Sequence, residues 1–146
     1  MRVTVHRSPT LDAPSLALVR EGGIAPLLRR SGDALGVAAR AGLAVRLTDD
    51  EELRRLNRRH TGVNAATDVL AFPGESRAWV GDVAISVERA RAQNPADPAA
   101  ELRLLAVHGL LHCLGHDHDK PGRAALMASE TRRLLPGQNV PDLAPH

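Results

Sequence analysis

The stretch HGLLHCLGHDHD, residues 108–119, has the histidine spacing of a metal-binding helix. It holds four of the seven histidines, and two of them, His108 and His112, are four residues apart. In an α-helix such residues lie on one face, about 6 Å apart along the axis. Gly115 can adopt the left-handed conformation that ends a helix, and His118 can then return towards the other two rings. The spacing therefore predicts three imidazoles around one metal ion.

The residues around these histidines predict a buried helix. Asp97 followed by Pro98 is a typical helix start, and Gly115 is a typical end. Seven aliphatic residues make this helix apolar on nearly all sides: Leu104, Leu105, Ala106, Val107, Leu110, Leu111 and Leu114. A buried imidazole without a partner costs about 1–3 kcal/mol, and a metal ion supplies the partner. The alternative is a buried helix whose histidines bond to backbone or water.

Three neutral nitrogen ligands with an open fourth position are typical of a catalytic zinc site. We therefore expect one zinc ion per chain, although imidazole also suits nickel, copper and iron. His116 could close the site as a fourth ligand, whereas Cys113 points about 100° away from His112 around the helix. Asp117 and Asp119 are candidates to orient the ligands or to cap the chain, and direct binding of either carboxylate to the ion is a further alternative.

The same spacing occurs in the zinc-protease pattern H-E-x-x-H-x-x-G-x-x-H, but Gly109 stands where that pattern has its general-base glutamate. Peptide hydrolysis benefits from that carboxylate, so a protease is disfavoured. A phosphodiester instead needs a Lewis acid and cations for the developing charge. The chain offers arginines for the second role, since Lys120 is its only lysine.

Composition narrows the remaining choices. The chain is 43% hydrophobic, enough for one folded domain, and its formal charge is only +2. Cys113 is the single cysteine, so an intramolecular disulfide is excluded. The sequence leads us to expect no signal peptide and no membrane-spanning stretch, and a cytoplasmic protein without a membrane partner. Phe72 and Trp79 are the only aromatic residues, so platforms for base stacking are scarce.

Hydrophobic periodicity predicts alternating strands and helices. The expected strands are residues 2–6, 43–48, 68–72 and 81–87. The expected helices are two within 13–43, one that begins with a capping box of Thr48 and Glu51, a short one from Ser86 to about 92, and the helices 97–114 and 122–135. We expect a single domain over residues 1–135 and a flexible tail over residues 136–146, which contains three prolines.

Three segments resemble the bacterial YbeY family of metal-dependent endoribonucleases. HGLLHCLGHDH is similar to the family signature H-G-x-L-H-L-x-G-aromatic-D-H, with Cys113 and His116 as departures. LNRRHTGVNAATDVLAFP, residues 56–73, resembles the family segment LN…TDVLSFP, and GDVAIS, residues 81–86, resembles the next strand. The resemblance implies an α+β fold, with a small mixed sheet of about four strands, about five helices and a zincin-like metal-binding helix.

The resemblance also implies candidate catalytic residues, with one departure. The family carries an arginine, thought to serve RNA cleavage, at the position of Thr61, and Arg58 and Arg59 lie just before it. The family's usual aspartate and proline downstream are replaced by Asn64 and Ala66. Either a neighbouring arginine reaches the same phosphate or catalysis is weakened. We therefore assign catalytic roles to Arg59, Arg58, His60 and Asp117, and substrate contacts to Arg54, Arg55, Thr61 and Asp82.

Several of these assignments have a structural alternative. Arg54, Arg55, Arg58 and Arg59 span about 140° of one helical face, which could track an RNA backbone or could be a solvated surface with a Glu51–Arg55 pair. His60 is either a buried structural histidine or a proton donor. Asp82 could orient a ligand or could bond to a turn.

The resulting hypothesis is a zinc-dependent, single-strand-specific endoribonuclease in ribosomal RNA maturation, including the 3′ end of 16S rRNA, and in ribosome quality control. The expected partners are precursor ribosomal RNA, the small subunit, and ribosomal proteins or assembly GTPases. The alternative is a zinc-stabilised ribosome-assembly factor that binds RNA with weak cleavage or none. The residue that favours this alternative is Thr61.

Overall fold

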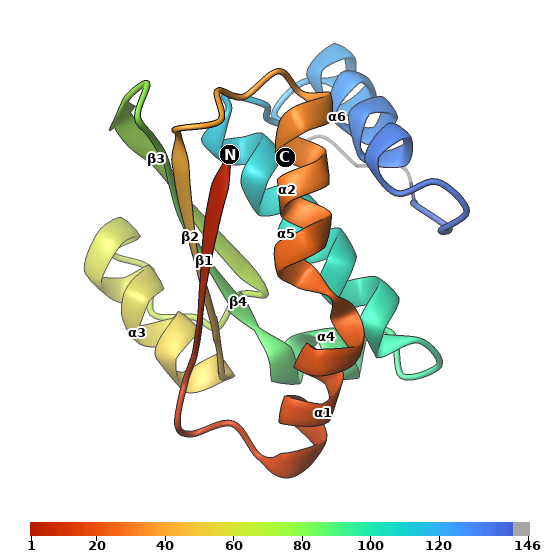
Figure 1. Ribbon diagram of the computed structural model, residues 1–146. Coiled ribbons are helices and arrows are strands. Elements are labelled where there is room, and N and C mark those ends of the chain that lie inside the picture. The colour runs from red at the N-terminus through yellow and green to blue at the C-terminus, as the bar shows by residue number, and fades with distance from the viewer. Residues whose placement is uncertain (142–146) are drawn as a thin grey trace.

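A mixed four-stranded sheet forms the centre of the computed structural model, which describes residues 1–141 (Figure 1). Its strands are β1 (Arg2–Arg7), β2 (Gly42–Thr48), β3 (Val69–Ser76) and β4 (Trp79–Ser86), in the order β1-β2-β4-β3. The pairs β1–β2 and β2–β4 are parallel, and β3 is antiparallel to β4. The predicted α+β fold with a mixed sheet is confirmed.

Six helices pack around this sheet within residues 1–141. They are α1 (Ala13–Gly22), α2 (Ile24–Ala34), α3 (Asp50–Thr61), α4 (Val87–Gln93), α5 (Pro98–Cys113) and α6 (Pro121–Leu134). Helix α3 lies on one face of the sheet, and α1, α2, α4 and α5 lie on the other (Figure 1). The sheet therefore separates the arginine-rich helix from the histidine-bearing helix.

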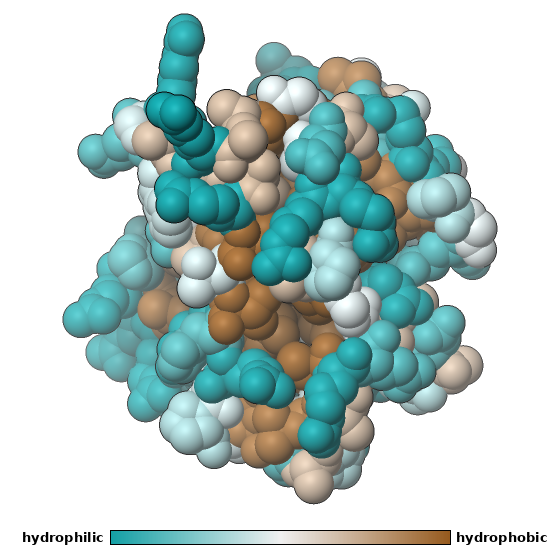
Figure 2. Space-filling model, in the orientation of Figure 1, coloured by the Kyte–Doolittle hydropathy of each residue, from teal (hydrophilic) through white to brown (hydrophobic). Residues whose placement is uncertain are grey.

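The main core lies between the sheet and helices α1, α2 and α5. Leu43, Val45 and Leu47 of β2 are buried, as their alternation predicts. Helix α5 contacts α1, α2, α4, α6, β3 and β4, which explains why it is apolar on nearly all sides. On the surface seen in Figure 2, apolar side chains show through the middle and hydrophilic side chains surround them.

Capping carboxylates and hydroxyls begin four of the helices in residues 1–141, including α1, where the Asp12 side chain accepts from the Ser15 amide. The Asp97 side chain accepts a hydrogen bond from the Ala100 amide at the start of α5, and Ser86 caps α4. The predicted capping box of Thr48 and Glu51 is wrong by one residue. Asp49 is the N-cap of α3 and accepts from the Glu52 amide at 2.9 Å, because Thr48 still belongs to β2.

Helix α6 and the segment after it form a second apolar cluster against α5. It comprises Leu27, Val107, Leu111, Met127, Leu134, Leu135 and Val140. Gln138 donates a hydrogen bond to the Ala100 carbonyl at 2.7 Å. The chain after α6 therefore contacts the domain as far as Val140, and residues 142–146 of the predicted tail lie outside the described part. No helix within residues 1–141 combines the length and apolar character needed to cross a membrane.

Candidate metal centre

Three histidine rings converge at the C-terminal end of α5. The ligand nitrogens of His108, His112 and His118 all lie within 4.8 Å of one another. The Nε2 atoms of His108 and His112 are 2.9 Å apart, and His118 has its ring centroid 5.4 and 5.6 Å from theirs. The predicted convergence of these rings is confirmed, and the group could hold a metal ion.

The separations of the nitrogen atoms fit a small metal ion. Two nitrogens bound to one tetrahedral zinc, at about 2.05 Å each, lie about 3.3 Å apart. The 2.9 Å between His108 and His112 is shorter by a few tenths of an ångström, a difference that small rotations of the rings can supply. All three rings are half-buried, so solvent can reach the group. These residues fit an ion with three protein ligands.

Local backbone chemistry brings His118 back to the helix. The chain leaves α5 at Leu114, and Gly115 has a φ of +96°, a conformation that glycine adopts at little cost. The Gly115 amide donates to the His112 carbonyl and the His116 amide to the Leu111 carbonyl, both at 3.0 Å. This turn reverses the chain within a few residues and returns His118 to the group.

Gly109 does not face the metal centre. A Cβ atom at this position would lie 2.5 Å from Cγ1 of Val83 and 3.4 Å from Cγ2 of Val69. The residue after the first histidine is therefore in contact with β4 and β3, and no space exists there for a glutamate side chain. The difference from the zinc-protease pattern follows from how closely this helix packs on its sheet.

The other candidate ligands of this segment have different roles. Within residues 1–141 the group of converging ligand atoms does not include His116 or Cys113. Cys113 is buried, and its Sγ lies 4.0 Å from the Asp82 carbonyl oxygen. The Asp117 carboxylate accepts from the His118 amide at 2.7 Å, which steadies the backbone of the third histidine, and Asp119 pairs with Arg123.

Comparison with known proteins identifies the family. The sequence model described as "Endoribonuclease YbeY" matches residues 21–138, most of the chain. The chain belongs to the YbeY endoribonuclease family. This membership supports a nuclease that hydrolyses phosphodiester bonds, and the three-histidine group is consistent with a metal-dependent one.

Individual YbeY relatives agree with this assignment. A protein of Chloroflexus aurantiacus named Endoribonuclease YbeY is 41% identical over 109 residues, 64% of this chain and 70% of that protein. One of Moorella thermoacetica with the same name is 38% identical over 127 residues, 76% of this chain and 81% of that protein. The solution structure of TM1509 from Thermotoga maritima shares the fold, with a TM-score of 0.57 and 19% identity over 91% of this chain and 86% of that one.

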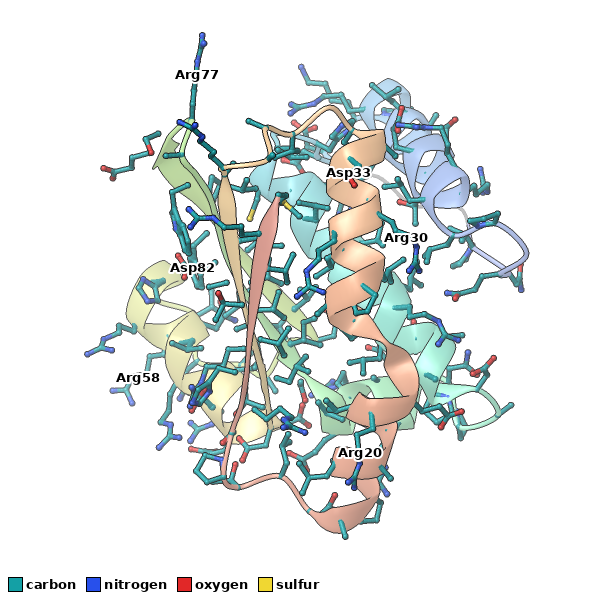
Figure 3. All side chains as sticks on the ribbon, in the orientation of Figure 1. Arg20, Arg30, Asp33, Arg58, Arg77 and Asp82 are labelled. Carbon is teal, nitrogen blue, oxygen red and sulfur yellow. The ribbon has the colours of Figure 1, made fainter. Side chains whose placement is uncertain are left out.

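The candidate arginines of this YbeY-family chain lie on the other face of the sheet. Arg55 and Arg59 line a cavity of about 480 Å³ together with Arg46, and Arg58 points away from the sheet into solvent (Figure 3). Arg54 donates to Glu51 and to Asn64. The predicted pair of Glu51 with Arg55 is therefore replaced by one with Arg54, and the structure does not bring these arginines into one cavity with the histidines.

His60 and Asp82 meet in a groove between α3 and the sheet. The groove, about 510 Å³, is also lined by Phe72, His6 and Arg46. His60 is exposed, so it is not the buried histidine of the structural alternative, and its ring packs against Phe72 in a tilted arrangement with the ring centroids 4.7 Å apart. Asp82 lies on the α3 side of the sheet (Figure 3) and accepts from the Trp79 indole at 3.2 Å.

Thr61 is the last residue of α3 and is exposed, but its side chain turns back to the helix. Its hydroxyl is 2.7 Å from both the carbonyl and the side-chain oxygen of Asn57, and it accepts from the Val63 amide. Gly62, in the left-handed conformation, follows as the C-cap. An arginine at position 61 would therefore replace a hydroxyl that now bonds to the last turn of this helix.

Sequence reasoning missed three polar residues beside His108. Asp68, Gln93 and Glu101 line one cavity with this histidine. A signal did exist for Glu101, because it is a charged residue in an apolar helix and precedes His108 by two turns on the same face. Asp68 and Gln93 come from other segments, and no local pattern indicates that they meet α5.

Proposed function

We propose that this chain is a zinc-dependent endoribonuclease that cuts single-stranded precursor ribosomal RNA in the cytoplasm, including the 3′ end of 16S rRNA. The observation that carries the proposal is the convergence of His108, His112 and His118 at the end of a buried helix. Family membership supports RNA as the substrate. Zinc is favoured because three imidazoles with room for solvent are its usual catalytic ligand set.

The protein's own contribution is to hold the ligands and to position RNA. Zinc, when bound, supplies Lewis acidity towards a phosphoryl oxygen and activates a water molecule. His108 and His112 are held by a helix buried in the core, so little reorganisation is needed when an ion binds. Asp117 fixes the backbone of His118, which keeps the third ring aimed at the same point.

The arginines of α3 supply an approach for the RNA backbone. This helix ends at Thr61, and the loop 62–68 leads from it to β3, whose first residue Val69 shares a cavity with His108. A single strand that follows this edge of the sheet meets Arg58 and Arg59 before it reaches the histidines. Such contacts to phosphate are sequence-independent and weaken with salt.

A cleavage assay tests the proposal. Purified protein with one equivalent of zinc is incubated with a 16S rRNA fragment that carries its 3′ extension, and the products are mapped. We expect cutting by the wild type and by the control His116→Ala, whose ring is outside the group, and a loss of cutting in His112→Ala. An uncut fragment, or equal cutting by His112→Ala, contradicts the proposal.

A ribosome-assembly factor with weak or no cleavage is the second candidate, and Thr61 favours it. The hydroxyl of this residue is committed to Asn57, so position 61 supplies no cation. If the wild type lacks a cation that contacts the scissile phosphate, we expect Thr61→Arg to raise the cleavage rate by about tenfold or more. If the wild type cuts RNA and Thr61→Arg cuts it at the same rate, Arg58 or Arg59 already supplies the cation. Co-purification of this chain with the small ribosomal subunit tests whether ribosomal proteins or assembly GTPases are its partners. It also tests a role in ribosome quality control.

A further inference from the structure

A cavity of about 150 Å³ lies directly beside the metal group, with His108 as one of its walls. It is bounded by α4, α5, α6, the start of β3 and the segment after α6. Its apolar walls are Val69, Leu104, Leu105, Val140 and Pro141, and its polar residues are Asp68, Gln93, Glu101, Thr131 and His108. Mostly apolar walls with a few convergent polar groups are typical of sites for small organic ligands.

The size of the cavity matches one six-membered aromatic ring. An engineered protein cavity of about the same volume, about 150 Å³, binds benzene. A pyrimidine base has a ring of this size, whereas a purine adds a second fused ring. The flat faces of a pyrimidine would lie against aliphatic walls such as Leu104 and Val69, and its polar edge would have to meet Asp68, Gln93 and Glu101.

The polar end of the cavity favours a ligand that donates hydrogen bonds. Gln93 donates to the Asp68 carboxylate at 3.4 Å, and Glu101 lies next to both. Burial raises the pKa of Glu101, and the charge of Asp68 adds to this effect although a hydrogen bond with Gln93 opposes it. Two carboxylates at one end of a small cavity leave more acceptor oxygens than one glutamine amide can serve.

We propose that this cavity binds a pyrimidine base of the RNA substrate and prefers cytosine to uracil, a proposal that rests on the proposed nuclease function. Cytosine presents an amino group at C4, and aspartate and glutamate accept from it. Uracil presents a carbonyl oxygen at the same place, which faces the carboxylates as a second acceptor. The difference between the two bases is therefore greatest at the atoms that Asp68 and Glu101 would contact.

The position of His108 gives this base a role in the reaction. This histidine contributes Nε2 to the metal group and also lines the cavity. A base seated in the cavity therefore brings its attached phosphodiester next to the metal group. The cavity would select which bond of a flexible single strand is presented for cutting.

Binding of short RNA strands tests the proposal independently of cleavage. Two fluorescently labelled strands are compared on the zinc-loaded protein. They differ at one central position, cytosine or uracil, and carry a non-hydrolysable analogue of the neighbouring phosphodiester so that cleavage is prevented. We expect the cytosine strand to bind about tenfold more tightly, the discrimination usual for one good contact to a base edge. A strand with a central purine is expected to bind no better than the uracil strand.

Variants locate the preference in the cavity. Glu101→Gln removes an acceptor with little change in shape, and we expect the preference for cytosine to fall to about twofold or less. Glu21→Gln is the matched control, because Glu21 is exposed on α1 and outside the cavity, and it is expected to keep the full preference. Leu104→Trp fills the cavity and is expected to abolish the preference without loss of the bound metal.

The outcomes separate this inference from the nuclease proposal. If the wild type binds and cuts RNA with equal affinity for cytosine and uracil, the base site is wrong and the nuclease stands. A preference for a purine, or a cytosine preference that survives both Glu101→Gln and Leu104→Trp, also overturns the base site. If no RNA is bound at all, both proposals fail.

Discussion

Gly109 and Val83 are in such close contact that a single methyl group at position 109 would stand 2.5 Å from Cγ1 of Val83 and 3.1 Å from Cγ2. This contact joins the metal-binding helix to the central strand β4. It makes Gly109, which lies between His108 and His112, part of the core, so this position supplies no carboxylate to the three-histidine group.

We expect Gly109→Ala to destabilise the fold by about 1–3 kcal/mol, the usual cost of overpacking a core. Alanine favours a helix over glycine by up to about 1 kcal/mol, so the clash has to exceed that gain. Urea denaturation measures the change. Gly122→Ala in α6 is the control, because a Cβ there meets nothing within 4 Å. If both variants are as stable as the wild type, Gly109 is not needed for close packing.

Metal content is expected to depend on three histidines and not on the fourth in the same stretch. Elemental analysis of the wild type and of His116→Ala should find about one ion per chain. His112→Ala should lose most of it, because His108 and His118 alone cannot hold an ion tightly. Equal metal in His112→Ala and His116→Ala would place the ion elsewhere.

The affinity for metal is expected to fall in acid. Imidazole has to be neutral to bind a metal ion, and its ordinary pKa is about 6.5. Competition by protons should therefore weaken binding increasingly below this pH, as zinc titrations between pH 5 and 8 would measure. Affinity that is constant down to pH 4.5 would indicate ligands other than histidine.

Cys113 is expected to be inert in the folded protein. Burial raises the pKa of its thiol to about 11, and the nearby charge of Asp82 acts in the same direction. At pH 8 the reactive thiolate is then about 100-fold rarer than for a thiol with the reference pKa of 9.0. A chromogenic disulfide reagent should label the native protein slowly and the urea-unfolded protein rapidly. Equal rates would contradict the buried environment.

Asp49 is expected to contribute to stability only above acidic pH. A hydrogen bond from the Thr10 hydroxyl, together with the Glu52 amide, holds the pKa of this carboxyl below its usual value. Its contribution is therefore present above the unfolded pKa, near 4, and is lost as the pH falls through the folded pKa. Asp49→Ala should cost about 1 kcal/mol at pH 7, and the cost should shrink below about pH 4.

A matched control separates the cap from the charge. Asp49→Asn retains a good N-cap and should keep most of the stability at pH 7 with a weaker dependence on acid. Thermal unfolding of the three proteins at several pH values measures both effects. If Asp49→Ala costs as much at pH 3 as at pH 7, the carboxylate charge is not the source of the stability.

The convergence of the three histidines was predictable because its signals are local. The four-residue spacing of His108 and His112 and the glycine at position 115 are properties of one helix and one turn, and both hold in the structure. The strand 43–48 was predictable for the same reason, since its alternation matches its burial. Local periodicity also located α5 to within a residue or two.

The surroundings of the centre were not predictable, because they depend on segments far apart in the chain. Nothing near Arg59 indicates that α3 packs on the face of the sheet opposite α5. The capping error at Thr48 has a similar cause, because the strand pairing of β2 with β4 extends to that residue and moves the cap to Asp49. Val140 gave no local sign that it would pack on α6 and α5.

The structural elements that carry the three histidines also determine how an ion can bind and be released. Two of the rings belong to a helix enclosed by the core, whereas His118 belongs to a coil between α5 and α6. Only the coil residues 116–118 can move without disturbing the interior, so we expect their motion to set the rate of metal exchange. A substitution that makes this coil more rigid should slow the release of metal to a chelator even where the equilibrium affinity stays the same.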